Sequence, residues 1–223
     1  MEPTGDPARQ RHAQARAELA AYRPLDALQA QFQAEMLAFL EAHGQALSRH
    51  NPAGHLTASA LVLDAGRRRF LLLHHRKLGR WLQPGGHLDQ DPDLLSAARR
   101  EVREETGLHG LLGGPEIFDL DIHWIPERRR ADGLVEPRHR HFDVRFLLVC
   151  PREMPLVGSD ESRDLRWFSA AELAGLDSDD SVQRLVHKAG LSPGAEAQSA
   201  DPAGPAQRPL RQPGDGPSPS LRP

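Results

Sequence analysis

The chain has 223 residues, of which 26% are charged, and its formal net charge is −3. This length allows one well-packed domain with appended segments. The small net charge predicts no general affinity for nucleic acid or membranes, so an anionic ligand would need local basic groups or metal ions. The single cysteine, Cys150, excludes an intramolecular disulfide and favours a reducing compartment. The first residues lack the apolar core of a signal peptide, and no apolar run approaches the roughly 20 residues of a membrane span, so we expect a cytoplasmic protein.

The N-terminal part divides into two segments. Residues 1–24 are polar for most of their length and are expected to be flexible. Residues 25–52 are expected to form an amphipathic helix, to about residue 42, and a linker. Apolar residues recur there at helical spacing, at Leu25, Leu28, Phe32, Met36, Phe39 and Leu40. The helix is expected either to pack on the main domain or to form a homodimer contact.

The main domain is expected over residues 53–189 and has an α/β pattern. Alternating or continuous apolar runs predict strands at 55–64, 70–75, 116–125, 142–150 and 165–168. Helical patterns follow at 93–106, 170–175 and 179–189, and a long basic loop is expected over 126–141. Residues 190–223 are rich in Pro, Gly and Ser and have few large apolar side chains, which predicts disorder.

The segment 85–108 carries most of the chemical information. On a helix at about 100° per residue, Glu101 and Glu105 lie close to the direction of Leu94, and Glu104 lies on one flank. The three carboxylates therefore share an edge with the apolar stripe, while Arg99 and Arg103 are expected to face solvent. Partly desolvated like charges repel unless cations compensate them. Arg100 can pair with Glu104 at i,i+4 spacing, and Mg²⁺ or Mn²⁺ prefers oxygen ligands and shares its shell with substrate phosphates.

Other residues offer weaker signals. The twelve histidines do not predict a zinc site, because His74–His75 and the pair His139 and His141 lack a cysteine set or a helical H-x-x-x-H spacing. Basic loop residues could bind phosphates or be solvated, and aromatic residues could stack on a base or belong to the core. These are Arg76, Lys77, Arg80, Arg128–Arg130, Arg138 and Arg140, and Trp81, Trp124 and Phe142. Cys150 is expected to be a buried strand residue.

Gly86 and the run Arg100-Glu101-Val102-Arg103-Glu104-Glu105-Thr106-Gly107-Leu108 resemble the Nudix box, whose consensus is G-x5-E-x7-R-E-U-x-E-E-x-G-U. The resemblance implies a Nudix α/β/α sandwich around a mixed β-sheet, here with an extra N-terminal helix. It also implies hydrolysis of the diphosphate linkage in a nucleoside diphosphate linked to another moiety, with Mg²⁺ or Mn²⁺ as cofactor. The expected substrate is a small phosphorylated molecule, and nucleic acid is not expected as a partner.

The resemblance assigns roles to individual residues. Glu101, Glu104 and Glu105 would be metal ligands, and Gly86 could offer its carbonyl. Glu101 is alternatively the general base, and Arg100 would orient the glutamates. Glu101, Glu104 and Arg100 are therefore the expected catalytic residues, and the candidates for substrate contact are His87, Arg80 and Glu161.

One position departs from the consensus, because Pro92 stands where the first glutamate is expected. Asp91 is a good N-cap and Pro92 a good first helical residue, so the start of the helix is expected to survive. One carboxylate is lost, and Asp89, Asp91 or Asp93 could replace it.

Other functions remain open. The fold could serve as a catalytically weak ligand-binding or regulatory module. A diphosphate isomerase of the same fold is less consistent with the sequence, because it needs a cysteine earlier than Cys150. Removal of diphosphate from RNA 5′ ends is not favoured, since no RNA-binding module is recognisable.

Overall fold

The computed structural model describes residues 6–129 and 133–192. Its helices are α1 (Pro7–Ala21), α2 (Ala27–Ala42), α3 (Leu94–Thr106), α4 (Ala170–Leu173) and α5 (Asp180–Lys188). Its strands are β1 (Gly54–Leu63), β2 (Arg69–His75), β3 (Trp81–Leu82), β4 (Gly85–His87), β5 (Asp119–Ile125), β6 (Arg128–Arg129), β7 (Val135–Glu136), β8 (His139–Val149) and β9 (Ser162–Ser169).

The centre of the fold is a mixed sheet. In the described part of the chain its strands follow the order β3-β2-β1-β8-β5, with β9 paired to β2 and β4 paired to β1. β1 and β8 run parallel along their whole length, whereas the other pairs are antiparallel. β1 pairs with β2 at Val62 and Leu63 and with β4 at residues 57–59, so its edge is divided between two partners. The diglycine of β4 therefore lies where β2 separates from β1.

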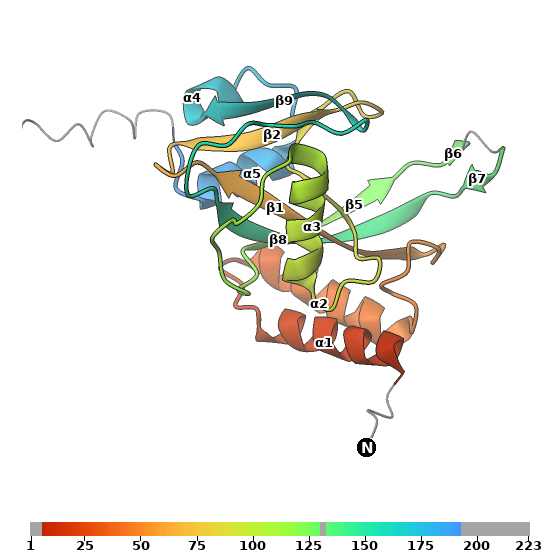
Figure 1. The fold of residues 1–223 in the computed structure, drawn as a ribbon. Coiled ribbons are helices and arrows are strands. Elements are labelled where there is room, and N and C mark those ends of the chain that lie inside the picture. The colour runs from red at the N-terminus through yellow and green to blue at the C-terminus, as the bar shows by residue number, and fades with distance from the viewer. Residues whose placement is uncertain (1–5, 130–132, 193–223) are drawn as a thin grey trace, which may run out of the picture. The chain divides into compact units, whose positions relative to one another are not determined.

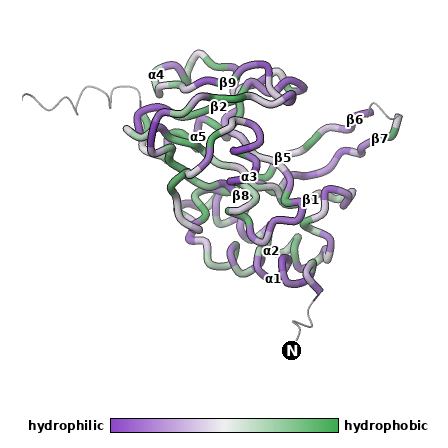
Figure 2. The backbone as a smooth tube through the Cα atoms, viewed as in Figure 1, coloured by the Kyte–Doolittle hydropathy of each residue, from purple (hydrophilic) through white to green (hydrophobic). Residues whose placement is uncertain are grey.

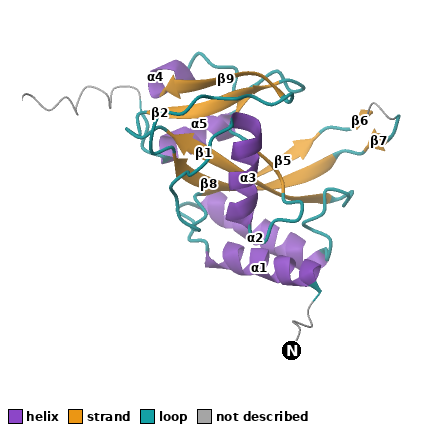
Figure 3. Ribbon diagram, in the orientation of Figure 1, coloured by secondary structure: helices purple, strands orange, loops and turns teal. Residues whose placement is uncertain are grey.

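Helices cover both faces of this sheet (Figures 1 and 3). The larger core joins α1, α2 and α3 to one face of β1, β5 and β8, and its members include Leu19, Phe39, Val102, Ala58 and Phe146. The second core joins α4 and α5 to β1, β2 and β9, with Val182, Leu185, Leu61, Phe70 and Phe168 among its members. Hydrophobic segments accordingly gather in the central strands (Figure 2). This arrangement confirms the predicted α/β class and the helix-sheet-helix layering.

Within the segment 1–24, the expectation of flexibility is wrong for residues 7–21, which form α1. Asp6 caps the helix by accepting from the amide of Ala8, and Pro7 begins it. Ala15, Leu19 and Tyr22 are buried against the core. Their i, i+4, i+7 spacing includes only one aliphatic residue larger than alanine, so the stripe was too weak to distinguish from a polar tail.

The other boundaries differ from the predictions mainly at strand ends. α2 lies within the expected range 25–42, and its buried side chains join the core. The expected loop 126–141 instead contains β6, β7 and the start of β8, which extend from the sheet as two paired arms (Figure 1). In the described ranges, no helix combines the length and apolar character required to cross a membrane. Most of the predicted disordered tail, residues 193–223, lies outside the described residues.

Candidate functional site

Arg100, in the middle of α3, is the centre of an acidic cluster formed by that helix and the loop before it. Its Nη1 atom lies 3.0 Å from Glu101 Oε1 and 3.0 Å from Glu104 Oε2. Its Nε and Nη2 atoms both donate to Asp91 Oδ2, at 3.0 and 2.9 Å, and Nη2 also donates to the carbonyl of His87 at 2.7 Å. Burial alone would lower the pKa of Arg100, but these carboxylates raise it, so the guanidinium stays charged. The guanidinium of Arg100 therefore holds three carboxylates and the backbone of β4 together.

Glu101 projects from α3 towards the backbone of the diglycine. A Cβ atom placed on Gly86 would lie 2.6 Å from Glu101 Oε1, so only glycine leaves this space to the carboxylate. The side chain of Glu101 is largely buried, and burial raises its pKa despite the opposing charge of Arg100. The close approach expected of the diglycine is thus present in the structure.

Glu105 is the most buried of the three glutamates, at 7% exposure. Its Oε2 atom accepts a hydrogen bond of 2.9 Å from the amide of Gly85. Burial raises its pKa to about 8, the Gly85 amide opposes this shift, and the charges of Glu101, Glu161 and Glu104 add to it. Glu104 is half exposed. The helical projection correctly placed these carboxylates along the edge of the apolar stripe.

The start of α3 corrects the expected capping. The N-cap is Asp93, whose Oδ1 accepts from the amide of Ser96 at 2.7 Å, and the helix begins at Leu94. Pro92 consequently lies before the helix, and Asp91 is not a cap. Pro92 and Asp93 separate Asp91 from the first residue of α3, and the side chain of Asp91 binds the guanidinium of Arg100 instead of capping the helix. Asp89 lies 3.8 Å from Arg100 and is half exposed.

The three predicted substrate residues occupy different places. His87 lies on β4, with its ring against His55 and its Nδ1 in contact with the guanidinium of Arg49. Glu161 is close enough to raise the pKa of Glu105 through its charge. Arg80 is exposed and forms an ion pair of 3.9 Å with Asp177. The structure thus groups Glu161 with the carboxylates of α3, while Arg80 belongs to a separate surface ion pair.

The aromatic, cysteine and arginine residues considered from the sequence lie in different parts of the fold. Phe142 is fully buried and stacks on Phe39, so it belongs to the core. Trp124 is exposed on β5 and lies under the guanidinium of Arg138. Cys150 is buried, as expected. Arg99, expected to face solvent, is partly exposed, and its guanidinium donates to the carbonyls of Leu111 and Gly113 in the loop that follows α3.

A polar strip on the sheet, beside the diglycine, was not found from the sequence. The carboxylate of Asp143 accepts hydrogen bonds from Thr57 at 3.0 Å and from Ser59 at 2.7 Å, and Gln83 lies 3.4 Å from it. Gly85 pairs with Ser59, so the strip continues to the amide that binds Glu105. Polar residues alternate along β1 and along β8, and this alternation is visible in the sequence. Only the pairing of the two strands shows that Thr57 lies opposite Asp143.

Histidines extend this strip towards the start of β1. The side chains of His55, His139 and His141 place ring nitrogens within 4.8 Å of one another. The pair His139 and His141 has neither a cysteine set nor a helical H-x-x-x-H spacing, but β1 places a third histidine beside it. A third ligand on a distant strand has no characteristic sequence spacing.

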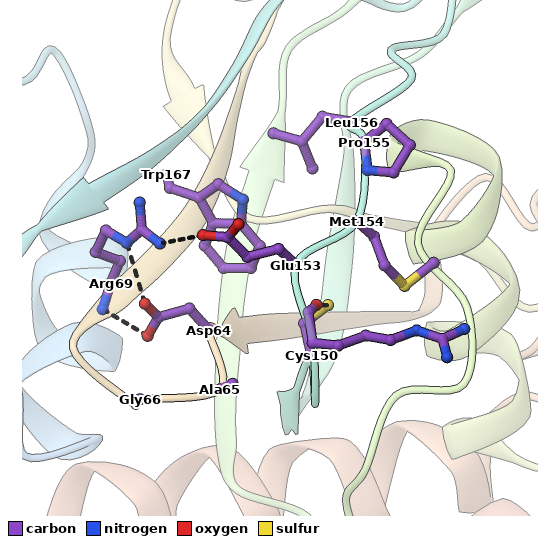
Figure 4. Close-up of a pocket in the computed structure, with 11 residues that line it drawn as sticks. Asp64, Ala65, Gly66, Arg69, Cys150, Glu153, Met154, Pro155, Leu156 and Trp167 are labelled. Carbon is purple, nitrogen blue, oxygen red and sulfur yellow. Dashed lines mark hydrogen bonds and ion pairs between the residues drawn. The ribbon is translucent and has the colours of Figure 1, made fainter.

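The two described cavities lie away from the carboxylates. One, of about 570 Å³, is found where β1 and β8 end; its walls include Asp64, Cys150, Met154 and Trp167 (Figure 4). The other, of about 610 Å³, lies between Asp26 and α5. Neither is lined by a predicted site residue. The candidate site is instead the acidic edge formed by the carboxylates around Arg100.

The residues at this edge fit a hard divalent cation. Arg100 is one positive charge facing the carboxylates of Asp91, Glu101 and Glu104, which leaves excess negative charge. Glu105 adds a fourth carboxyl group beside Gly85. The donor set is composed of oxygens, which suits Mg²⁺ or Mn²⁺. An ion held here would contact the carboxylates of Glu101, Glu104 and Glu105.

Comparisons with known proteins agree with this arrangement. A sequence model of the NUDIX domain matches residues 54–188, more than half of the chain. The chain is 33% identical over 98 residues to a probable DHNTP pyrophosphohydrolase of Lactococcus lactis subsp. cremoris, covering 44% of this chain and 55% of that protein. It is 33% identical over 124 residues to phosphatase NudJ of Escherichia coli K12, covering 53% and 71%. The chain therefore spans only about half the length of the first relative.

Solved structures were also compared with this fold. The C. elegans Ap4A hydrolase binary complex aligns with a TM-score of 0.47 at 19% identity, covering 60% of this chain and 93% of that one. The E. coli dihydroneopterin triphosphate pyrophosphohydrolase aligns with a TM-score of 0.47 at 22% identity, covering 59% and 92%. It is the domain match, together with the geometry around Arg100, that decides the family. The chain belongs to the Nudix family of hydrolases.

Proposed function

We propose that this protein hydrolyses the diphosphate linkage of a nucleoside diphosphate linked to another moiety, with Mg²⁺ or Mn²⁺ as cofactor. The observation that carries the proposal is the set of carboxylates on α3 that Arg100 holds against the diglycine. The names of the two curated relatives, a pyrophosphohydrolase and a phosphatase, agree with a reaction at a phosphoanhydride.

Glu101, Glu104, Glu105 and the carbonyl of Gly86 would hold the cation. A divalent ion in such a site neutralises the diphosphate and lowers the pKa of a bound water. The protein contributes position: Arg100 fixes the carboxylates of Glu101 and Glu104 at 3.0 Å from its own nitrogen. Phosphoryl transfer depends mainly on such positioning and on charge stabilisation.

The general base would come from the most buried carboxyls. Glu105 has a pKa of about 8 in the absence of a cation, because it is buried. Glu101 is the other candidate, since its pKa is also raised and its carboxylate lies against the backbone of Gly86. Glu161 acts on Glu105 through its charge and would contribute to cation binding or to the proton transfer.

The substrate is proposed only as a class. It would be a small molecule with a phosphoanhydride, bound at the open edge next to His87. Phosphate release should be measured on nucleoside di- and triphosphates, dihydroneopterin triphosphate, sugar nucleotides and dinucleoside polyphosphates, each with Mg²⁺ and with Mn²⁺.

Glu104→Gln is the most informative variant, because Glu104 is half exposed and its replacement should leave the fold intact. We expect the rate constant kcat to fall by at least about a hundredfold, since removal of one group that stabilises charge in a transition state has effects of that order. The measurement is steady-state phosphate release on the best substrate of the panel.

Glu41→Gln is the matched control, since Glu41 is an exposed glutamate on α2. It should retain wild-type activity. Equal activity of the Glu104→Gln and wild-type proteins would contradict the assignment of the site. Absence of turnover across the panel, with Mn²⁺ still bound to the wild type, would instead favour a binding module.

A further inference from the structure

Three histidines from two parallel strands converge on one face of the sheet. His55 on β1 lies opposite His141 on β8, and His139 is two residues from His141 on the same face. The ring centroid of His55 lies 4.6 Å from that of His141 and 5.1 Å from that of His139. One ring nitrogen from each of the three lies within 4.8 Å of the others. Strand register, and not chance contact of flexible side chains, brings them together.

His55 has no partner for its polar atoms. It is 1% exposed, and both Nδ1 and Nε2 are buried without a hydrogen bond among the described residues. A neutral imidazole carries one donor and one acceptor, and buried polar atoms are nearly always satisfied. A ligand located among the three rings would satisfy the acceptor nitrogen of His55.

His139 is oriented as a metal-binding histidine would be. Its Nδ1 lies 2.8 Å from the carbonyl of Pro137, a hydrogen bond that places the proton on Nδ1 and leaves the lone pair on Nε2. Its Nε2 lies 3.3 Å from His141 Nε2. Two nitrogens bound at about 2.0–2.1 Å to a tetrahedral Zn²⁺ lie about 3.3 Å apart, so this separation suits a common cation.

We propose that His55, His139 and His141 form a binding site for a divalent transition metal of the Zn²⁺ class. Three neutral imidazoles favour Zn²⁺, Ni²⁺ or Cu²⁺ and discriminate against Mg²⁺. The Oε1 atom of Glu136 lies 3.7 Å from His139 Nε2. The donor set and the strands are different from those of the carboxylate site on α3, so the two sites would select different ions.

The charge state of the rings is consistent with this site. Burial lowers the pKa of His55 to about 3 and, with the charges of neighbouring histidines, also lowers that of His141. The convergence of one nitrogen from each of the three rings within 4.8 Å is the feature that suits a shared cation.

The test is Zn²⁺ binding by full-length protein that has been stripped with EDTA and returned to a buffer with excess Mg²⁺. Calorimetry should give one Zn²⁺ per chain. Substitution of Co²⁺ should produce the visible absorption of a four-coordinate site. His139→Gln should weaken binding by at least about tenfold, the smallest effect common for groups around a bound metal. His109→Gln, which replaces an exposed histidine, should bind as the wild type does.

His55→Leu separates metal binding from folding. Because the His55 nitrogens have no partners, the metal-free variant should melt at the wild-type temperature or above it. It should lose the rise in melting temperature that Zn²⁺ gives the wild type. Glu104→Gln should keep that rise, which distinguishes this site from the carboxylates. A wild type that binds no stoichiometric Zn²⁺, or a His55→Leu protein with an unchanged Zn²⁺ response, would overturn the proposal.

Discussion

Two neighbouring aspartates before α3 have different tasks. Asp93 caps the helix, whereas Asp91 binds Arg100 through two hydrogen bonds. Without Asp91, Arg100 would keep its ion pairs with Glu101, Glu104 and the more distant Asp89, but its guanidinium would be freer to turn away from the carbonyl of His87. Asp91 therefore holds the guanidinium of Arg100 beside the carboxylates of Glu101 and Glu104.

Substitution of each aspartate should separate these tasks. Asp93→Ala should lower the free energy of unfolding by about 1 kcal/mol, as the loss of an N-cap does, with little change in kcat. Asp91→Asn should affect stability less and lower kcat about tenfold, because a 1 Å displacement of a catalytic group has effects of this order or larger. Urea denaturation and steady-state kinetics on both proteins test this, and equal effects on kcat would contradict it.

Gly86 is required by the close approach of Glu101. In Gly86→Ala the new Cβ would lie 2.6 Å from the carboxylate, so Glu101 must move. We expect kcat/KM to fall by about a hundredfold for a displacement of this size. Gly44→Ala is the control, since no atom lies within 4 Å of the added Cβ. If Gly86→Ala retains full activity with an unchanged fold by circular dichroism, the assigned position of Glu101 is incorrect.

The contact between α5 and the sheet depends on buried charges. Asp143 and Asp121 bind Arg145 at 2.8 and 3.2 Å, and Arg184 and Lys188 on α5 bind Asp121 and Asp119 at 2.8 and 2.9 Å. Three carboxylates thus face three basic groups. Arg145 also donates to the hydroxyl of Ser181 on α5. The apolar side chains of α5 add to this contact by packing in the second core.

Arg145→Met should therefore be strongly destabilising. The variant preserves much of the side-chain volume but leaves an excess of buried negative charge at Asp121 and Asp143. Breaking such a network from one side costs about 3–5 kcal/mol of unfolding free energy. Arg103→Met, at an exposed position of α3, should change stability by less than about 0.5 kcal/mol. Chemical denaturation of both variants provides the comparison, and a loss below 1 kcal/mol for Arg145→Met would not fit this network.

The two N-terminal helices complete the molecule on the side of α3. α1 packs on α2, and Gln33 on α2 donates to the carbonyls of Leu19 and Tyr22 at the end of α1. Arg11 on α1 donates to the carbonyl of Asp89, in the loop that precedes the acidic cluster. The extra helices are therefore part of the core and also contact the loop that carries Asp91.

Acid stability of the whole protein should depend on Asp121. Burial would raise its pKa, but hydrogen bonds from His123 and Arg184 and the charge of Arg145 lower it below the ordinary value of 3.8. The unfolded chain then binds more protons than the native one, so this contribution is complete above pH 3.8 and is lost as pH falls through the native pKa.

Comparison of the free energy of unfolding at pH 7 and pH 3 tests this dependence. Asp121→Asn should be less stable at pH 7 and should lose less stability on acidification than the wild type. Asp160→Asn, which removes an exposed carboxylate, should follow the wild-type profile. If the free energy of unfolding falls equally between pH 7 and pH 3 in the wild type and in Asp121→Asn, another group controls the loss of stability in acid.

The sequence by itself determined how the charged side chains are arranged on α3. Helical periodicity placed Glu101 and Glu105 beside the apolar stripe, and the pairing of Arg100 with Glu104 followed from their spacing alone. Most strands were recognisable for a similar reason, because alternation along a short segment is a local property. Local periodicity failed at α1, where alanine supplies much of the buried surface.

Only the tertiary structure decided which distant residues meet. The parallel pairing of β1 with β8 joins His55 to His141 and Thr57 to Asp143, and the turn before Asp93 sends Asp91 to Arg100 instead of to the helix end. Strand register and loop path result from packing of the whole core, and a shift of one residue in the register of β1 would move His55 and Thr57 to the other face of the sheet. Contacts of that kind are absent from any short segment of the sequence.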